Sequence, residues 1–287
     1  MNIFLSGARG QVGWELQRTL ATLGTVAAPT RQQLDLTDAS ALRRYLRELQ
    51  PDLIVNPAAY TAVDKAETEP ELARAANAIA PAIMAEEAAK SGATMVHYST
   101  DYVFDGSKSG AYAETDPASP LGIYGKTKLE GEQAVIASGI PHLILRTSWV
   151  YGLRGGNFLL TMQRLFKERD QLNIVADQFG APTWSRMIAE ATAQILSQKP
   201  FSTERNMSGI YHLTNRGTTT WHAFASAILT RTNLPEGKKI LLHPIPSSQY
   251  PTPARRPANS VLSGDKLYAK FGIALPDWET ALDLCMG

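Results

Sequence analysis

Three regularly spaced glycines near the N-terminus constrain the fold of this chain more than any other feature. Gly7, Gly10 and Gly13 follow a short apolar segment, and the residues after them repeat apolar side chains at helical spacing. Glycines at a strand-to-helix turn let the backbone approach a pyrophosphate, and the helix N-terminus then offers unpaired N–H groups to it. The pattern predicts a dinucleotide-binding loop, although a turn that binds nothing has the same spacing. The residues assigned to the loop are Gly7, Gly10, Gln11, Val12 and Gly13.

Strand-like and helix-like segments alternate through the first half of the chain. The strand-like segments are 2–6, 25–28, 53–56, 94–99 and 142–146, and the helix-like ones are 11–23, 39–49, 69–91 and 121–138. Such alternation predicts a parallel sheet with helices on both faces, which is a doubly wound α/β fold of the Rossmann type. We expect this domain to span residues 1–150 and to bind its ligand at the carboxyl ends of the strands.

The alternation loosens after about residue 150, where prolines become frequent. Helix-like pieces remain at residues 157–169, 186–197 and 220–230. We expect residues 151–287 to form mainly a smaller substrate-binding lobe, partly interwoven with the first domain.

Composition argues against several classes of function. The 287 residues are 44% hydrophobic and 19% charged, with a formal net charge of +1 and no basic tract. This balance argues against nucleic acid or a membrane surface as a partner. Cys285 is the only cysteine, which excludes a disulfide within the chain and makes a cysteine metal site implausible. Neither a leader-like segment nor an apolar run of membrane-spanning length is visible, so we expect a cytoplasmic protein.

The segment after the second strand bears on which nicotinamide nucleotide the chain would bind. NAD-preferring folds of this type often place an acidic residue there, where it bonds the ribose hydroxyls. This chain has Thr30 and Arg31 instead, and an arginine pairs well with the 2′-phosphate of NADPH. We therefore expect NADPH, with NADH as the alternative. Asp35 and Leu36 are candidates to contact the adenine, through its amino group and its ring face.

Tyr124 and Lys128 are four residues apart on a segment predicted to be helical, so both side chains lie on one face. An ammonium beside a phenol favours the tyrosinate and lowers the tyrosine pKa from about 10 towards neutrality. A tyrosine tuned in this way exchanges a proton with a carbinol oxygen, and the same lysine can bond the nicotinamide ribose. An exposed tyrosine packed on a lysine stem has the same spacing. The position after the glycine loop, in the second half of the predicted sheet, favours a catalytic pair that acts on a ketone.

A hydroxyl at the end of the fourth strand completes the candidate catalytic set. Ser99 and Thr100 are adjacent there, and the alternation of side chains along a strand lets only one of them point into the cleft. We take Thr100 as the residue that bonds a substrate carbonyl beside Tyr124, with Ser99 as its competitor.

Several longer motifs are spread over nearly the whole chain. They are residues 10–13, 56–59, 62–67, 97–106, 146–151, 177–183 and 252–257. Together with the glycine loop and the Tyr124/Lys128 pair, they resemble the extended short-chain dehydrogenase/reductase superfamily and, within it, the dTDP-4-dehydrorhamnose reductase family.

The resemblance implies NADPH-dependent reduction of the C4 ketone of dTDP-4-dehydro-L-rhamnose to dTDP-L-rhamnose, a sugar nucleotide used in polysaccharide biosynthesis. Hydride would pass from NADPH to C4, and Tyr124 would protonate the developing alkoxide. In this reading Thr100, Tyr124 and Lys128 fall on the family's catalytic positions. The nicotinamide loop falls on Ala58, Ala59 and Tyr60, and the substrate contacts fall on Val63, Thr100, Asp101 and Trp149. Arg255 or Arg256 holds the nucleotide end, and Arg256 is our candidate. Without the resemblance, Trp149 would be assigned to the core.

Two positions depart from patterns seen in some members of that family. Some carry an acidic residue at the position of Thr30 and use NADH readily, so the threonine strengthens the expectation of NADPH. Some dimerise through Mg²⁺ held partly by glutamates at the positions of Glu15 and Arg186. Arginine cannot ligate Mg²⁺, which prefers oxygen donors. We therefore expect no metal site, with Glu15 as a weak magnesium candidate, and a monomer or weak homodimer.

Two other functions fit parts of the pattern. A related nucleotide-sugar epimerase or dehydratase would need an extra acid or base near Thr100, and none beyond Asp101 is seen. A non-catalytic NADP-binding regulatory subunit would have no chemical need for the Tyr124/Lys128 pair.

Overall fold

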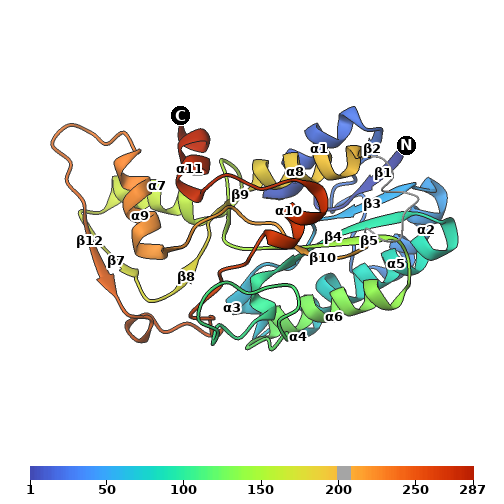
Figure 1. Ribbon diagram of the computed structural model, residues 1–287, viewed down its shortest axis with the longest axis horizontal. Coiled ribbons are helices and arrows are strands. Elements are labelled where there is room, and N and C mark those ends of the chain that lie inside the picture. Colours follow the sequence, from blue (N-terminus) through green and yellow to red (C-terminus); the bar gives the residue numbers. More distant parts are fainter. Residues whose placement is uncertain (199–207) are drawn as a thin grey trace.

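A six-stranded parallel sheet forms the centre of the larger part of the molecule (Figure 1). The computed structural model describes residues 1–198 and 208–287. The strands are β1 (Asn2–Leu5), β2 (Thr25–Ala27), β3 (Leu53–Asn56), β4 (Thr94–Thr100), β5 (His142–Thr147) and β10 (Gly209–His212). Their order across the sheet is β10-β5-β4-β3-β1-β2 and all pairs are parallel, so the predicted Rossmann-type fold is confirmed.

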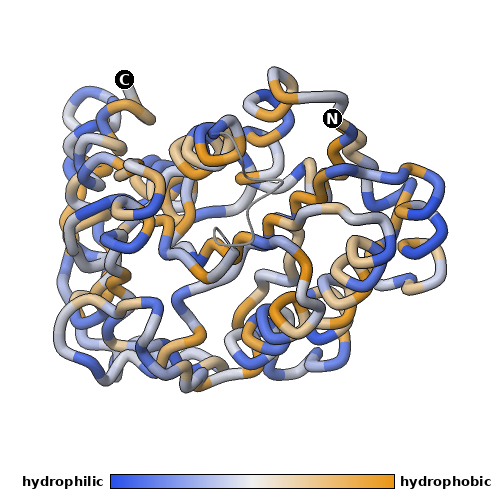
Figure 2. Tube along the Cα trace, turned by 45° about the vertical axis from the view of Figure 1, so that its right-hand side comes forward, coloured by the Kyte–Doolittle hydropathy of each residue, from blue (hydrophilic) through white to orange (hydrophobic). Residues whose placement is uncertain are grey.

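Helices cover both faces of this sheet, as Figure 1 shows. One face carries α1 (Gln11–Thr19), α8 (Ser185–Ser197) and α10 (Asp265–Phe271), and the other carries α2 (Ala39–Leu49), α5 (Ala80–Ser91) and α6 (Ile123–Ala137). Side chains alternate along each strand, so Leu5 and Val55 enter one apolar cluster while Phe4 and Ile54 enter the other. The apolar strands at the centre stand out in Figure 2.

The long alanine-rich segment after β3 is interrupted just before Pro81. It begins with α3 (Val63–Ala66) and α4 (Pro70–Arg74), passes through a π-helical turn at Ala75–Ile79, and continues as α5. Pro81 has no N–H to donate to the carbonyl of Asn77 one turn earlier, so a regular helix cannot run through this point. The turn widens instead, and wide turns of this kind are frequent at functional sites. Gly92 ends α5 in the left-handed conformation, with φ +77°.

A smaller lobe lies beyond the carboxyl ends of the strands (Figure 1). Its core is formed around α7 (Phe158–Glu168), α9 (Trp221–Thr230) and α11 (Trp278–Met286). Its short strands pair as β6 (Val150–Tyr151) with β9 (Thr183–Trp184), β7 (Gln171–Val175) with β12 (Leu241–Ile245), and β8 (Phe179–Gly180) with β11 (Thr219–Thr220). β10 and α8 also follow residue 150, yet both belong to the sheet layer. The division into residues 1–150 and 151–287 stays a prediction, and residues 199–207 of the second part lie outside the described residues.

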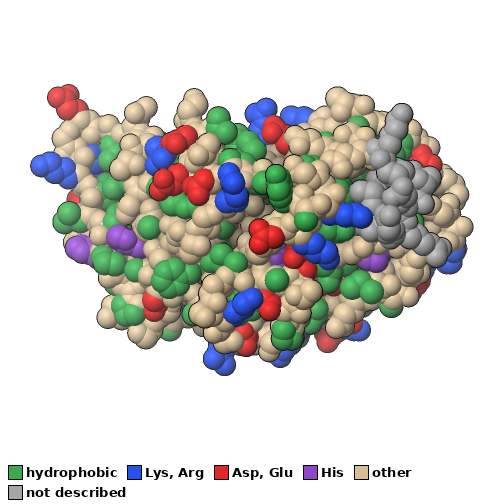
Figure 3. All heavy atoms as spheres, viewed as in Figure 1, with side chains coloured by type: hydrophobic (Ala, Val, Ile, Leu, Met, Phe, Trp, Pro, Cys, Tyr) green, Lys and Arg blue, Asp and Glu red, His purple; other side chains and the backbone are tan. Residues whose placement is uncertain are grey.

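The visible surface carries charges of both signs. On the face drawn in Figure 3, Lys and Arg side chains and Asp and Glu side chains are scattered among hydrophobic and other residues. Within residues 1–198 and 208–287, no helix is long and apolar enough to cross a membrane.

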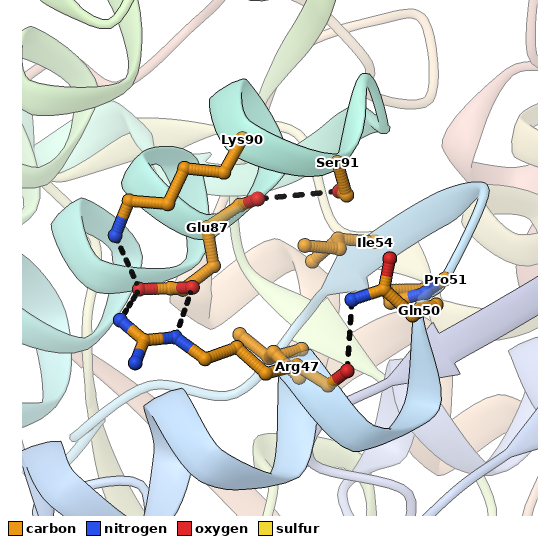
Figure 4. Close-up of a pocket in the computed structure, with 8 residues that line it drawn as sticks. Arg47, Gln50, Pro51, Ile54, Glu87, Lys90 and Ser91 are labelled. Carbon is orange, nitrogen blue, oxygen red and sulfur yellow. Dashed lines mark hydrogen bonds and ion pairs between the residues drawn. The ribbon is translucent and has the colours of Figure 1, made fainter.

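An ion-pair cluster around the Glu87 carboxylate joins α2 to α5 and lines a pocket of about 210 Å³ beside Pro51 (Figure 4). The Glu87 carboxylate is 4% exposed and accepts hydrogen bonds from Arg47, Arg43 and Lys90 at 2.8–3.1 Å. These bonds, led by the one from Arg47, lower the pKa of Glu87 to about 2. Pro51 precedes β3, so the pocket lies at the amino ends of the strands, away from the edge where such sheets bind ligands. We assign the cluster to stability.

Replacing Glu87 with Gln is expected to lower the free energy of unfolding at pH 7 by about 1–3 kcal/mol, because three cations lose their buried partner. The folded pKa lies below the ordinary 4.5, so the ionised carboxylate stabilises the fold fully above pH 4.5 and the gain disappears as the pH falls towards 2. Urea unfolding of both proteins at several pH values measures this. Glu86→Gln is the matched control, since the Glu86 side chain is 53% exposed and its ion pair is with Arg43. Equal effects of the two substitutions at pH 7 would contradict the assignment.

Candidate active site

The glycine loop meets the loop after β3 at the point where the strand order reverses. The chain passes from β1 to β2 on one side and then to β3 on the other, and ligands bind at such switch points. Gly7 has φ +58°, and a Cβ there would lie 2.9 Å from the Cα of Ala58. A Cβ on Gly13 would lie 2.2 Å from the carbonyl oxygen of Gly7. Only glycine therefore permits this turn, and the turn brings the N-terminus of α1 to the edge of the sheet.

A cleft of about 490 Å³ opens between these two loops and the segment after β2. Nine of the predicted cofactor residues line it, namely Gly7, Gly10, Thr30, Arg31, Asp35, Leu36, Ala58, Ala59 and Tyr60. The N-cap residue of α1, Gly10, makes no side-chain cap bond, and the first turn of α1 has no acidic residue. The N–H groups of that turn are therefore suited to a phosphate.

The remaining predicted loop residues lie beside the cleft rather than in its wall. Gly13 packs on Gly7, and Val12 packs against the apolar cluster of its face. Gln11 reaches the lobe, where its Nε2 lies 3.5 Å from the carbonyl oxygen of Val150 and its Oε1 accepts from Asn157 at 2.9 Å. Gln11 thus ties the glycine loop to the lobe.

Arg31 is an exposed charge on the wall of the cleft that follows β2. Its side chain is 78% exposed, and its Nε lies 3.5 Å from a carboxylate oxygen of Asp35. Asp35 is held more firmly, because its Oδ1 accepts from the backbone and hydroxyl of Thr37 at 2.9 and 2.7 Å. These bonds lower the pKa of Asp35. Arg31 is thus free to turn towards an anion in the cleft.

α6 carries Tyr124 and Lys128 to the carboxyl end of β4. A Cβ on Gly125 would lie 2.2 Å from the carbonyl oxygen of Tyr102, so glycine allows this close approach of α6 to the turn Asp101–Val103. The ring of Tyr124 meets that of Tyr102 edge-on, with centroids 5.4 Å apart. Lys128 is 2% exposed, and its Nζ donates to the carbonyl oxygen of Tyr98 at 2.6 Å.

The predicted lowering of the Tyr124 pKa is wrong for the protein without ligands. Desolvation of the hydroxyl raises the pKa of Tyr124 to about 12, although a hydrogen bond with Thr100 lowers it. Desolvation also lowers the pKa of Lys128 to about 8. The i, i+4 argument fails because Lys128 points its ammonium at a strand carbonyl, while burial and the charge of Asp101 raise the pKa of the phenol.

Thr100, and not Ser99, faces Tyr124. The Thr100 hydroxyl donates to Asp101 at 2.9 Å and accepts from the backbone N–H of Tyr102 at 3.2 Å. The hydroxyl of Ser99 is buried without a hydrogen-bond partner among the described residues. Burial raises the pKa of Asp101, which is 2% exposed, to about 6.

The candidate substrate residues come from four separate segments. Asp101 lies next to Thr100, and Val63 begins α3. Arg256 forms an ion pair with Asp64 at 2.9 Å, and both charges act on Tyr102 beside Tyr124. Trp149 is half-buried just after β5, where its indole stacks on Trp221 of the lobe. The structure thus places Asp101, Tyr124 and Arg256 around Tyr102, with Trp149 where the lobe begins.

Known proteins resemble this chain over its whole length. A family model described as the RmlD substrate binding domain matches residues 1–287. A dTDP-4-dehydrorhamnose reductase from Burkholderia thailandensis is 50% identical over 292 residues, which cover 100% of this chain and 98% of that protein. The chain belongs to the dTDP-4-dehydrorhamnose reductase family.

Solved structures of the family share the fold described above. A dTDP-4-dehydrorhamnose reductase from Clostridium acetobutylicum has a TM-score of 0.91 and 37% identity, and the match covers 99% of this chain and 98% of that one. The enzyme of the same name from Bacillus anthracis, solved in complex with NADP, has a TM-score of 0.89 and 34% identity, with 99% and 98% covered.

The position of Glu15 bears on the predicted absence of a metal site. Glu15 lies on α1 near Arg186. A hydrogen bond from Arg186 to Glu190, at 2.8 Å, raises the pKa of Arg186, and the charge of Glu15 raises it further. Within the described ranges, no group of three or more His, Cys, Asp or Glu side chains could hold a metal ion. The absence of a metal stays a prediction.

The sequence patterns did not identify a buried chain of hydrogen bonds that lies beneath the cleft. The N–H of Ala58 donates to the hydroxyl of Ser6, which donates to Asn56 at 2.5 Å, and the Asn56 amide donates to Nδ1 of His97 at 3.1 Å. This order leaves the proton of neutral His97 on Nε2, which has no partner among the described residues. The positive charge of Lys128 adds to the burial that lowers the pKa of His97.

Asn77 is a second residue that the sequence patterns did not identify. It lies in the π-helical turn, is 0% exposed, and its amide bonds both the N–H and the carbonyl of Tyr60, at 2.8 and 3.2 Å. It also donates to the hydroxyl of Thr127 on α6 at 3.2 Å. Asn77 thus connects the loop after β3 to the helix of Tyr124 and Lys128. The sequence signal that could have identified it is a single amide side chain within an alanine-rich helical segment.

Proposed function

We propose that this chain reduces the C4 ketone of dTDP-4-dehydro-L-rhamnose to dTDP-L-rhamnose with NADPH. The observation that carries the proposal is the meeting of Thr100, Tyr124 and Lys128 at the carboxyl edge of the sheet, next to a glycine cleft suited to a dinucleotide. The near-complete match to dTDP-4-dehydrorhamnose reductases supports the identity of the sugar nucleotide.

The cofactor fits the residues of the cleft. The glycine loop and the first turn of α1 would hold the pyrophosphate, Ala58 and Tyr60 would line the nicotinamide half, and Lys128 would reach the ribose. When bound, NADPH supplies the hydride that reduces C4.

Tyr124 supplies the proton in the proposed reaction. A phenol whose pKa is raised to about 12 stays protonated at neutral pH, so it is ready to donate to the alkoxide that develops on the sugar oxygen. Thr100 orients the carbonyl beside the phenol, and the charge of Lys128 favours the tyrosinate left after proton transfer. Asp101, with a pKa of about 6, is ionised above that pH and then accepts from a sugar hydroxyl.

The first test follows the loss of reduced-nicotinamide absorbance with freshly generated dTDP-4-dehydro-L-rhamnose, with NADPH and NADH in parallel. Rapid oxidation that is faster with NADPH supports the substrate and the role of the segment after β2. Cofactor binding without oxidation points to a different sugar nucleotide or to a regulatory subunit.

The cofactor preference depends on Arg31. Replacing it with Ala is expected to raise the KM for NADPH by about 10-fold and to leave the KM for NADH unchanged. Only NADPH carries a 2′-phosphate, and in the variant this phosphate loses its charged partner. Arg44→Ala is the matched control, an exposed arginine on α2 outside the cleft. Equal changes for both nucleotides would count against this role of Arg31.

We also propose that the protein acts in the cytoplasm, as a monomer or weak homodimer and without Mg²⁺. The single cysteine suits a reducing compartment, and the charge of Arg186 disfavours a cation beside Glu15. Sedimentation velocity with and without EDTA tests the last two points.

A further inference from the structure

Trp149 occupies a backbone conformation that tryptophan rarely adopts. Its φ is +47°, in the left-handed region, and of the other described non-glycine residues only Gln50 shares a positive φ. The residue lies in the two-residue break between β5 and β6, where the chain leaves the sheet and enters the lobe. Conformations of this kind persist when surrounding contacts hold them, and they concentrate at ligand sites.

The contact that holds Trp149 is a parallel stack with Trp221. The two ring centroids are 3.5 Å apart and the ring planes differ by 7°. On its edge, the Trp149 indole lies against Gly180, where a Cβ would come within 2.4 Å of a ring atom. Only glycine at position 180 therefore leaves room for the indole in this place.

Trp221 is itself fixed by the lobe. Its indole N–H donates to Oε1 of Gln178 at 3.2 Å, and the Gln178 amide donates to the hydroxyl of Ser247 at 3.0 Å. The ring of Phe158 packs against Trp221 with centroids 4.7 Å apart. Three segments of the lobe thus hold Trp221, whereas Trp149 stands at the end of the sheet.

We propose that Trp221 is a positioning residue: it holds the Trp149 indole, against the strain of its backbone, as a preformed wall for the sugar of the substrate. The inference rests on the proposed function. Without the stack, the indole would sample other orientations, and sugar binding would have to restrict it again. Loss of the stack should leave the binding of the cofactor and of the nucleotide half of the substrate unchanged.

The stack has a spectroscopic signature that does not depend on activity. Stacked indoles at this distance couple their transitions, and a rotation of one ring relative to the other about the stacking axis gives a paired positive and negative band in circular dichroism. Wild type should show this couplet, and it should stay when product binds. Trp221→Leu should abolish it, and Trp278→Phe should keep it. Trp278 is the matched control, because it lies in the same lobe core and packs edge-on against Phe224 instead of Trp149.

The kinetic test separates the sugar from the nucleotide. In Trp221→Leu, the KM for dTDP-4-dehydro-L-rhamnose should rise about 10-fold, while the inhibition constant of dTDP and the affinity for NADPH stay unchanged. Trp221→Phe should restore most of the affinity, and Trp278→Phe should match wild type. A lost couplet with an unchanged KM would overturn the proposal. An equal rise in the KM for the sugar nucleotide in Trp221→Leu and Trp278→Phe would overturn it as well.

If Trp221→Leu does not fold, Gly180→Ala decides, since it displaces the Trp149 indole from its edge and keeps both tryptophans. The same rise in KM is expected, and wild-type KM with a disturbed couplet would overturn the proposal. Absence of turnover by wild type would instead reject the proposed function, and the couplet would still report whether the indoles stack.

Discussion

Replacing Tyr124 with Phe is expected to lower turnover by at least about 100-fold while NADPH still binds, because the substitution removes one oxygen and with it the proton donor. The hydroxyl hydrogen-bonds with Thr100, and its pKa is raised to about 12 by desolvation. Steady-state turnover and a fluorescence titration with NADPH measure the two effects separately.

Tyr102→Phe is the control for this variant. Tyr102 lies edge-on to Tyr124 and burial raises its pKa as well, yet it has no assigned role in proton transfer. We expect Tyr102→Phe to keep turnover within about 10-fold of wild type, the scale of losing one hydrogen bond. Retained turnover in Tyr124→Phe would remove the assigned role.

The second large effect concerns Lys128. Replacing this lysine with Met should also lower turnover by at least about 100-fold, because no charge then favours the tyrosinate or bonds the nicotinamide ribose. The same substitution should raise the stability of the free protein. Lys128 is 2% exposed, and desolvation lowers its pKa to about 8. Burial of the charged ammonium therefore destabilises the folded protein, and an apolar side chain at this position avoids that cost.

The sign of the stability change depends on pH. The folded pKa of Lys128 lies below the ordinary 10.5, so its burial penalty is fully present below about pH 8 and fades as the pH rises towards 10.5. Lys128→Met should therefore gain about 1–2 kcal/mol in free energy of unfolding at pH 7 and much less at pH 10. Unfolding by urea at both pH values measures the gain. A variant that is less stable than wild type at pH 7 would contradict the account of this site.

The sequence predicted what depends on local pattern. The glycine loop and the strand–helix alternation each need only neighbours in the chain, and the structure has both. Alternation along β4 left only one of Ser99 and Thr100 to point into the cleft, and in the structure Thr100 is the one that hydrogen-bonds with Tyr124. The segment 69–91 is helical as expected, and the structure adds a π-helical turn at Ala75–Ile79, just before Pro81.

The sequence could not predict what depends on burial and on distant segments. The direction of the Tyr124 pKa was wrong, because a spacing of four residues does not reveal that Lys128 would bond a carbonyl of β4. The chain from Ala58 to His97 joins β1, β3 and β4, and no local pattern links those residues. The Trp149–Trp221 stack joins residues 72 positions apart, which only the packing of the lobe brings together.

The most direct test of the central claim is isotopic. The protein is incubated with dTDP-4-dehydro-L-rhamnose and NADPH deuterated at the transferable position of the nicotinamide, and the product is examined by NMR. The account predicts dTDP-L-rhamnose with deuterium at C4, formed by wild type and, at the same enzyme concentration and time, nearly absent with Tyr124→Phe. Product without deuterium at C4, or no product from a protein that binds NADPH, would contradict it.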